Sequence, residues 1–145
     1  MEKKIIVIIS GGIIALILGA GVFLQKSEKA GANGSDNLVS KSGLHWHADI
    51  AIVVKGKNIE VPPNIGLEAG HNPVHTHDNE PNIIHMEFPG IVRQDDLVLG
   101  EFFRVWKKDI RSFGTNIKMT VNGVENTEFE KYHMKDKDKI VLSYE

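Results

Sequence analysis

An apolar run of twenty residues, Ile5 to Leu24, directly follows the N-terminal Met-Glu-Lys-Lys, and Ser10 is its only polar side chain. At about 1.5 Å per residue, a helix of this length covers about 30 Å, the hydrocarbon thickness of a bilayer. The apolar core of a secretory signal peptide is shorter, about 7 to 15 residues. We therefore predict an N-terminal tail and transmembrane helix over residues 1–24. A removed signal peptide is the alternative, because Ala30-Gly31-Ala32 offers a small-residue cleavage site.

The lysines that flank this run do not decide its orientation, since Lys3 and Lys4 precede it and Lys26 and Lys29 follow it. A short basic tail normally stays inside, and a large domain after a first span is translocated largely regardless of its charge. We expect a single-pass protein of the cell membrane, anchored in lipid by its N-terminal helix, with the C-terminal domain extracytoplasmic.

Small residues recur every four positions in the predicted anchor, at Gly11, Ala15 and Gly19. This spacing places them along one helix face and allows close approach of a second helix. The anchor is therefore expected to be able to form a homodimer.

The chain contains no cysteine, which excludes a disulfide framework, a lipidated cysteine anchor and a thiolate metal site. A net charge of -2 gives no broad electrostatic attraction to nucleic acid, so no nucleic-acid partner is expected. Any metal ion must be bound through nitrogen and oxygen.

Residues 25–43 are rich in Lys, Ser, Gly, Asn and Ala, with Leu38 and Val39 as the only large apolar residues. This composition predicts a flexible linker. Residues 44–145 contain nearly all the aromatic residues and are long enough to bury a core. One extracytoplasmic domain over this range is predicted.

The first half of the domain has the pattern of a β-hairpin followed by a long loop. Leu44 to Val54 is rich in β-branched residues, and a turn over residues 55–58 leads to a returning strand from Ile59 to Val61. Residues 64–82 contain several Gly and Pro residues and no periodicity. Loops of this length are uncommon and often functional.

The second half has the pattern of one helix between strands. Strands are predicted over residues 83–88, 117–121 and 140–144, with a charged turn over residues 135–139. A helix is predicted from Leu97 to Lys108. Two aspartates are its expected N-terminal caps, and four large apolar residues at helical spacing form its expected core face: Asp95, Asp96, Leu99, Phe102, Phe103 and Trp106.

These elements predict an α+β fold in which a transmembrane helix precedes a small β-rich domain with one main helix. Their order resembles the β-grasp fold of ubiquitin-like domains. A small barrel and a cupin-like fold are the alternatives.

Six of the seven histidines lie between His45 and Glu87, mostly in pairs two residues apart. The pairs are His45-Trp46-His47, His75-Thr76-His77 and His85-Met86-Glu87. Residues two apart on a strand point to the same face, so both side chains of a pair can reach one ion, with imidazole nitrogens about 2.0 to 2.1 Å from the metal.

We predict that these pairs supply one mononuclear metal site. Three interpretations remain open for Glu87: a ligand, a supporting carboxylate or an ordinary strand residue. Asp78 is a candidate to orient a histidine, although its setting is also typical of a turn. The expected ligands are His45, His47, His75, His77 and His85, while His71 is expected to be peripheral and His133 a bystander.

Four motifs resemble those of an uncharacterised archaeal and bacterial family of small membrane-anchored or secreted proteins. They are Leu-His-x-His, His-Thr-His-Asp, Ile-Ile-His-x-Glu and Leu-Gly-x-Phe-Phe-x-x-Trp, and they begin at residues 44, 75, 83 and 99. The resemblance covers most of the domain and implies that the five expected histidine ligands belong together, but it implies no activity. The resemblance to cupins is weaker, because the spacing differs and a second cupin motif is absent.

Copper or zinc is the expected ion, and three classes of function follow. A binding module would capture, store or transfer copper at the cell surface, which suits imidazole ligands and the strong affinity of nitrogen donors for Cu(II). A metalloenzyme would keep an open coordination position, and its site would resemble the zinc site of α-type carbonic anhydrases. A structural or adhesion domain would need the ion only to fold. Binding is the leading prediction, and the sequence leaves open whether the protein is an enzyme.

Overall fold

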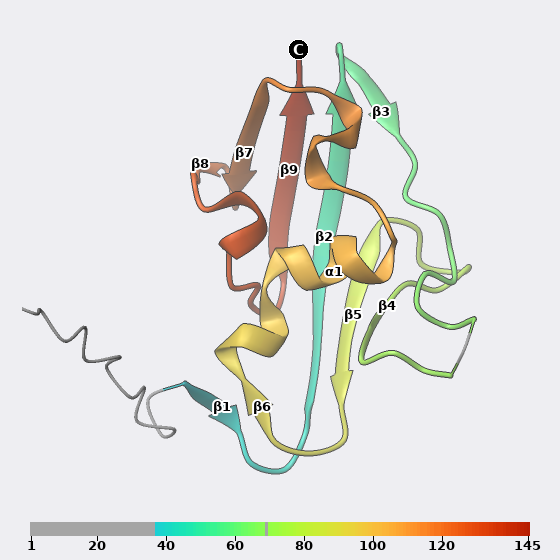
Figure 1. Ribbon diagram of the computed structural model, residues 1–145, viewed down its shortest axis with the longest axis vertical. Helices are drawn as coiled ribbons and strands as arrows, with labels where there is room; N and C mark the ends of the chain where they lie inside the picture. Colours follow the sequence, from blue (N-terminus) through green and yellow to red (C-terminus); the bar gives the residue numbers. More distant parts are fainter. Residues whose placement is uncertain (1–36, 69) are drawn as a thin grey trace, which may run out of the picture. The chain divides into compact units, whose positions relative to one another are not determined.

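The computed structural model describes residues 37–68 and 70–145 (Figure 1). The predicted transmembrane helix, the alternative cleavage site and the small-residue face lie outside these residues, as does most of the predicted linker. Among the residues that are described, no helix combines the length and the apolar character needed to cross a membrane.

Two parallel strands lie at the centre of a seven-stranded sheet (Figure 1). They are β2 (Leu44–Val54) and the C-terminal strand β9 (Asp138–Tyr144), and β7 (Ile117–Val121) pairs with β9 in the antiparallel direction. Apolar residues at alternate positions of these strands point to one face and are buried. The buried face therefore forms the floor of the hydrophobic core.

Two strands pair with β2 on the side opposite β9. The first half of β2 pairs with β5 (Ile83–Phe88), and its last residues pair with β3 (Lys57–Ile59). Lys55 and Gly56 form the hairpin turn, both with positive φ, as a type I′ turn requires. Two further strands, β4 (Val74–His75) and β8 (Val124–Glu125), complete the order β4-β5-β2-β9-β7-β8.

One α-helix, α1 (Leu99–Val105), packs on the buried face through Leu99, Phe102 and Phe103. It is shorter than the helix predicted over residues 97–108, and a 3-10 helix, η1 (Gln94–Leu97), precedes it. The capping prediction is wrong for α1, whose N-cap is Val98 without a side-chain hydrogen bond. Asp96 instead accepts a hydrogen bond from the backbone N–H of Arg93 at 2.7 Å, so this carboxylate stabilises the preceding turn.

Short elements connect these strands and the helix. β6 (Val92–Arg93) pairs with β1 (Leu38–Ser40), which lies within the segment predicted as linker. Val39 of β1 packs against the hydrophobic core, and this apolar contact explains why the chain is ordered here. Two more 3-10 helices, η2 (Ile110–Phe113) and η3 (Phe129–Lys131), follow α1.

The predicted α+β class with one main helix is confirmed over the described residues, as are the strands predicted over residues 44–54, 83–88 and 117–121. The last strand begins at Asp138, two residues before its predicted start. Asp138 is buried but accepts hydrogen bonds from Tyr132, Asn122 and the backbone of Lys135, which explains how a carboxylate can begin this strand.

Candidate metal centre

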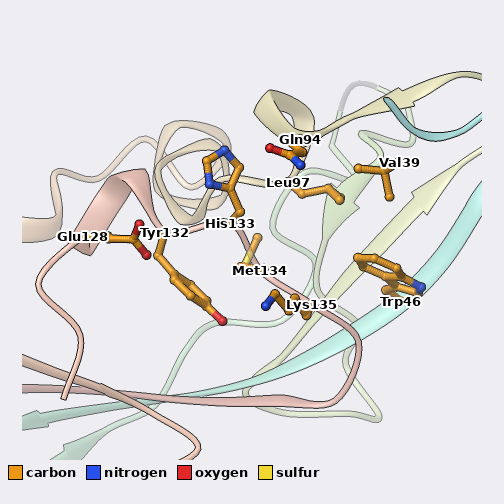
Figure 2. A pocket seen from close by; sticks show the side chains of 9 residues that line it. All are labelled: Val39, Trp46, Gln94, Leu97, Glu128, Tyr132, His133, Met134 and Lys135. Atoms are coloured by element: carbon orange, nitrogen blue, oxygen red, sulfur yellow. The ribbon is translucent and has the colours of Figure 1, made fainter. Parts of the chain in front are cut away.

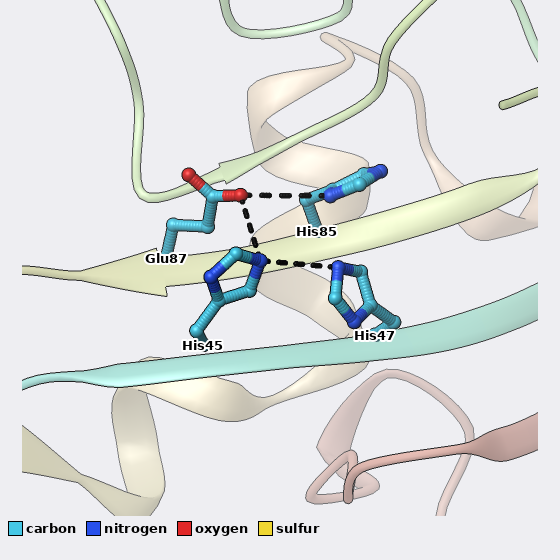
Figure 3. Close-up of side chains that lie close together, drawn as sticks. All are labelled: His45, His47, His85 and Glu87. Atoms are coloured by element: carbon cyan, nitrogen blue, oxygen red, sulfur yellow. Dashed lines mark hydrogen bonds and ion pairs between the residues drawn. The ribbon is translucent and has the colours of Figure 1, made fainter. Parts of the chain in front are cut away.

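The register of three strands brings the histidine motifs together on one face of the sheet. Along β2 and β5, His45 lies opposite Glu87 and His47 lies opposite His85. On the other side of β5, His75 of β4 lies opposite His85. The residues between them on β2 and β5 point to the face covered by α1, so the histidines occupy the opposite face (Figure 3).

The long loop before β5 is fixed by Thr76, which lies between His75 and His77 and is buried. Its hydroxyl donates to the Pro62 carbonyl at 2.9 Å and accepts from the Ile65 N–H at 3.1 Å, and its own N–H donates to the Ile65 carbonyl. These bonds tie the loop to β4 and hold both flanking histidines against the sheet.

The donor atoms fall into two groups, each with all its members within 4.8 Å of one another. The outer group is His45, His47, His85 and Glu87, and the inner group is His75, His77, His85 and Glu87. Both groups could hold a metal ion. The grouping differs from the single five-histidine site expected from the motifs, because the two His-x-His pairs approach His85 from different strands.

In the outer group, three separations match the edge of a coordination tetrahedron. His45 Nε2 lies 3.2 Å from His47 Nε2 and 3.1 Å from Glu87 Oε1, and His85 Nδ1 lies 3.6 Å from the same oxygen (Figure 3). Ligands about 2.0 to 2.1 Å from a tetrahedral ion are about 3.3 Å apart. All four donor atoms lie within 4.8 Å of one another, near enough to share one ion.

In the inner group, one ring nitrogen of His75 is directed at His77. His75 Nδ1 lies 2.9 Å from the Asn72 carbonyl oxygen, which can only accept, so Nδ1 carries the proton and Nε2 keeps its lone pair. His75 Nε2 lies 3.1 Å from His77 Nε2. Burial of the ring lowers the pKa of His75 below its ordinary value, which favours the neutral, metal-binding form.

His85 lies between the two pairs and is only 3% exposed. Its Nε2 lies 2.8 Å from Glu80 Oε2, close enough for an ion pair, while its Nδ1 lies 3.6 Å from Glu87 Oε1 and makes no hydrogen bond. Burial, followed by the neighbouring His47 and His77, lowers the pKa of His85. A buried nitrogen without a hydrogen bond is costly, and a metal ion at Nδ1 would satisfy it while Glu80 orients the ring through Nε2.

The remaining predicted residues lie apart from both donor groups. Asp78 and His71 are exposed, although the His71 ring lies 5.6 Å from the His75 ring. His133 lies near Asp95 in a cavity of about 390 Å³ that Trp46 also lines (Figure 2). Trp46 points away from its neighbours His45 and His47, so this cavity and the donors belong to opposite faces of β2.

Sequence reasoning missed two residues beside the donors. Glu80 lies in the loop before β5 and approaches His85, and Asn72 orients His75 through its backbone carbonyl. A carboxylate in a histidine-rich loop is a weak signal that could have indicated Glu80. A backbone carbonyl leaves no signal in the sequence, because any residue supplies one.

No family model, curated protein or solved structure matches this chain.

Proposed function

We propose that this chain is a membrane-anchored, extracytoplasmic protein that binds a transition-metal ion, copper in preference to zinc, and captures, stores or transfers it. The observation that carries the proposal is the face of β2 and β5, where three imidazoles and a carboxylate converge around the buried His85. Structural packing alone gives no reason to gather several imidazoles around a buried histidine whose Nδ1 makes no hydrogen bond.

The donor chemistry supports copper(II) or zinc(II). The chain has no cysteine, and imidazole with carboxylate suits both ions. Affinity for nitrogen and oxygen donors is higher for Cu(II) than for Zn(II) along the Irving–Williams order. Copper is therefore the preferred ion where both are available at similar concentrations.

The apolar run of residues 5–24 supports the membrane anchor, and the large domain after it supports an extracytoplasmic location. A domain exposed on that side meets metal ions before they enter the cell. Capture or transfer at the cell surface fits this position.

The experiment is elemental analysis of the full-length chain purified without added metal, followed by copper and zinc titration. The expected result is bound copper or zinc, with binding at the outer group at least about 100-fold weaker after the double change His45→Ala and His47→Ala, since loss of groups that merely orient ligands already costs about 10- to 100-fold. His71→Ala and His133→Ala are the matched controls. Equal affinity in the double variant would contradict the outer site.

A metalloenzyme is the second candidate, favoured by the exposure of the outer group. The His45 side chain is 63% exposed, so water can reach an ion bound beside it. A zinc ion with an open position lowers the pKa of bound water to about 7 and can activate it. Hydrolysis of an activated ester by the zinc-loaded chain, lost in the double variant, would support this candidate.

For the fold, we propose a β-grasp domain with an inserted strand pair. A β-grasp domain has a hairpin, a helix and a second hairpin before a last strand that runs parallel to the first. The order β3-β2-β9-β7-β8, with β2 parallel to β9, supports this assignment. The pair β4 and β5, with the loop that joins them, is then an insertion between the first hairpin and the helix, and it carries four of the six donors.

A further inference from the structure

The two groups share His85 and Glu87, so an ion in the outer group leaves only His75 and His77 without a role. We propose that the sheet face binds two metal ions side by side, one in each donor group, with His85 as the bridge between them. This inference rests on the proposed function and adds the number of ions, their ligands and their different accessibility.

The two His-x-His pairs have the same geometry. The Nε2 atoms are 3.2 Å apart in the outer pair and 3.1 Å apart in the inner pair. Each separation fits two ligands of one ion, since cis ligands about 2.0 to 2.1 Å from a tetrahedral metal are about 3.3 Å apart. The inner pair is also prepared for binding, because the Asn72 carbonyl keeps the proton of His75 on Nδ1.

The two pairs belong to different groups, and His85 lies in the middle. Its ring centroid is 4.6 Å from those of both His47 and His77. In the strand register it lies between His47 on β2 and His75 on β4. No other histidine among the described residues belongs to both groups.

A histidine can bridge two ions because it has two ring nitrogens. On His85, Nδ1 lies 3.6 Å from Glu87 Oε1, and Nε2, on the other side of the ring, lies 2.8 Å from Glu80 Oε2. When each nitrogen binds one ion, the ring loses its proton to solvent and becomes an imidazolate. Glu80, 2.8 Å from Nε2, then places a carboxylate oxygen beside the inner ion.

The two positions differ in exposure. The outer position lies beside His45, whose side chain is 63% exposed, while the inner position lies beside His75, which is 1% exposed. A chelator in solution should therefore remove the outer ion quickly and the inner ion slowly. The centre would combine a retained ion with an exchangeable one.

The test is a copper(II) titration of the full-length chain, with elemental analysis and electron paramagnetic resonance at each step. Two equivalents are expected, and the resonance per bound copper should fall as the second equivalent binds, because an imidazolate couples the two spins antiferromagnetically. Removal by excess chelator should show two phases.

Two variants locate the ions. His77→Ala should bind one equivalent with an uncoupled signal, and His45→Ala with His47→Ala should also bind one. His71→Ala is the control and should bind two. Because these comparisons require intact folds, circular dichroism of each metal-free variant is measured first, and the wild-type stoichiometry stands without any variant.

The outcomes separate the inference from the proposed function. One equivalent with an uncoupled signal in the wild-type chain would overturn the two-ion centre and leave metal binding intact. Two equivalents with undiminished resonance would overturn the His85 bridge. No bound copper or zinc would overturn both.

Discussion

At the scale of the residue, His85 combines properties that a stable fold does not require. It is buried, its pKa is lowered by that burial, and its Nδ1 makes no hydrogen bond. Buried polar groups without partners cost about 1–3 kcal/mol each. This cost lowers the stability of the metal-free protein and is offset when a metal ion binds His85. The residue therefore favours metal binding over the stability of the metal-free fold.

Replacement of His85 by leucine tests whether this residue serves metal binding or the stability of the fold. We expect the metal-free His85→Leu chain to be about as stable as the wild type, because removal of the unpaired Nδ1 offsets the loss of the contact between Nε2 and the half-exposed Glu80. Free copper at 100 times its wild-type Kd should add about 2.7 kcal/mol to the wild type and at most about 0.4 kcal/mol to the variant, whose affinity is expected to be at least about 100-fold weaker. Urea denaturation with and without copper measures both differences. A metal-free variant that is clearly less stable would show that the imidazole has a packing role.

The buried hydroxyl of Tyr144 leads us to expect that the protein loses stability at alkaline pH. Its hydroxyl donates to the Ile110 carbonyl at 2.6 Å, and burial raises its pKa to about 12. Because the folded pKa exceeds the ordinary value of about 10, the stabilisation is complete below about pH 10 and is lost as the pH rises toward 12.

The variant Tyr144→Phe should therefore lose less stability between pH 9 and pH 12 than the wild type. Burial and a hydrogen bond to Asp138 also raise the pKa of Tyr132, so some pH dependence should remain in the variant. Thermal unfolding across this range measures the difference. Identical pH profiles would refute the assignment to Tyr144.

At the scale of the element, β4 and its loop determine whether the inner pair reaches the sheet. The loop passes close to α1 at Gly66, which has φ of +81°. A Cβ atom there would lie 2.8 Å from Val105 Cγ1 and 2.9 Å from the Val74 carbonyl oxygen. Only glycine fits, and the Gly66 carbonyl accepts a hydrogen bond from the Asn72 N–H at 3.0 Å, which holds Asn72 where its own carbonyl orients His75.

The change Gly66→Ala should lower the free energy of unfolding by about 2 kcal/mol or more, because it combines a strained φ with a backbone clash. Gly56→Ala is the matched control, since its φ is +76° but no atom lies within 4 Å of the added Cβ. Chemical denaturation of the two variants isolates the effect of the clash. Equal losses would show that the loop adjusts around the added methyl group.

The sequence predicted the strands that carry the ligands but not their partners. The His-x-His spacing indicated that His45 and His47 share a face, which follows from strand geometry alone. The register that places His47 opposite His85 depends on long-range pairing, which no local pattern encodes. The division into two donor groups therefore needed the structure. The helix was predicted too long because the apolar spacing continues through Trp106, beyond the end of α1.

At the scale of the whole molecule, the two faces of the sheet have different roles. One face packs against α1 and forms the core, and the other presents the donors. The centre is therefore built on paired strands, which hold ligands more rigidly than loops do. Its outer position is accessible on the side of the sheet away from α1.

The proposed location predicts that protease added to intact cells cleaves this domain from its anchor. The segment of residues 25–36, before β1, is rich in Lys, Gly and Ser and offers cleavage sites. Immunoblotting for the domain in the medium measures its release, with a cytoplasmic protein as the control for lysis. Cleavage only after permeabilisation would place the domain inside.

Competition with a chelator of known copper affinity tests the central claim most directly, that the histidine face is a metal site. The full-length wild type, His85→Leu and His133→Ala are compared at the same pH. The wild type and His133→Ala should bind copper with equal affinity, while His85→Leu should bind at least about 100-fold more weakly, because it removes a ligand common to both groups. Equal affinity in all three proteins would contradict the account.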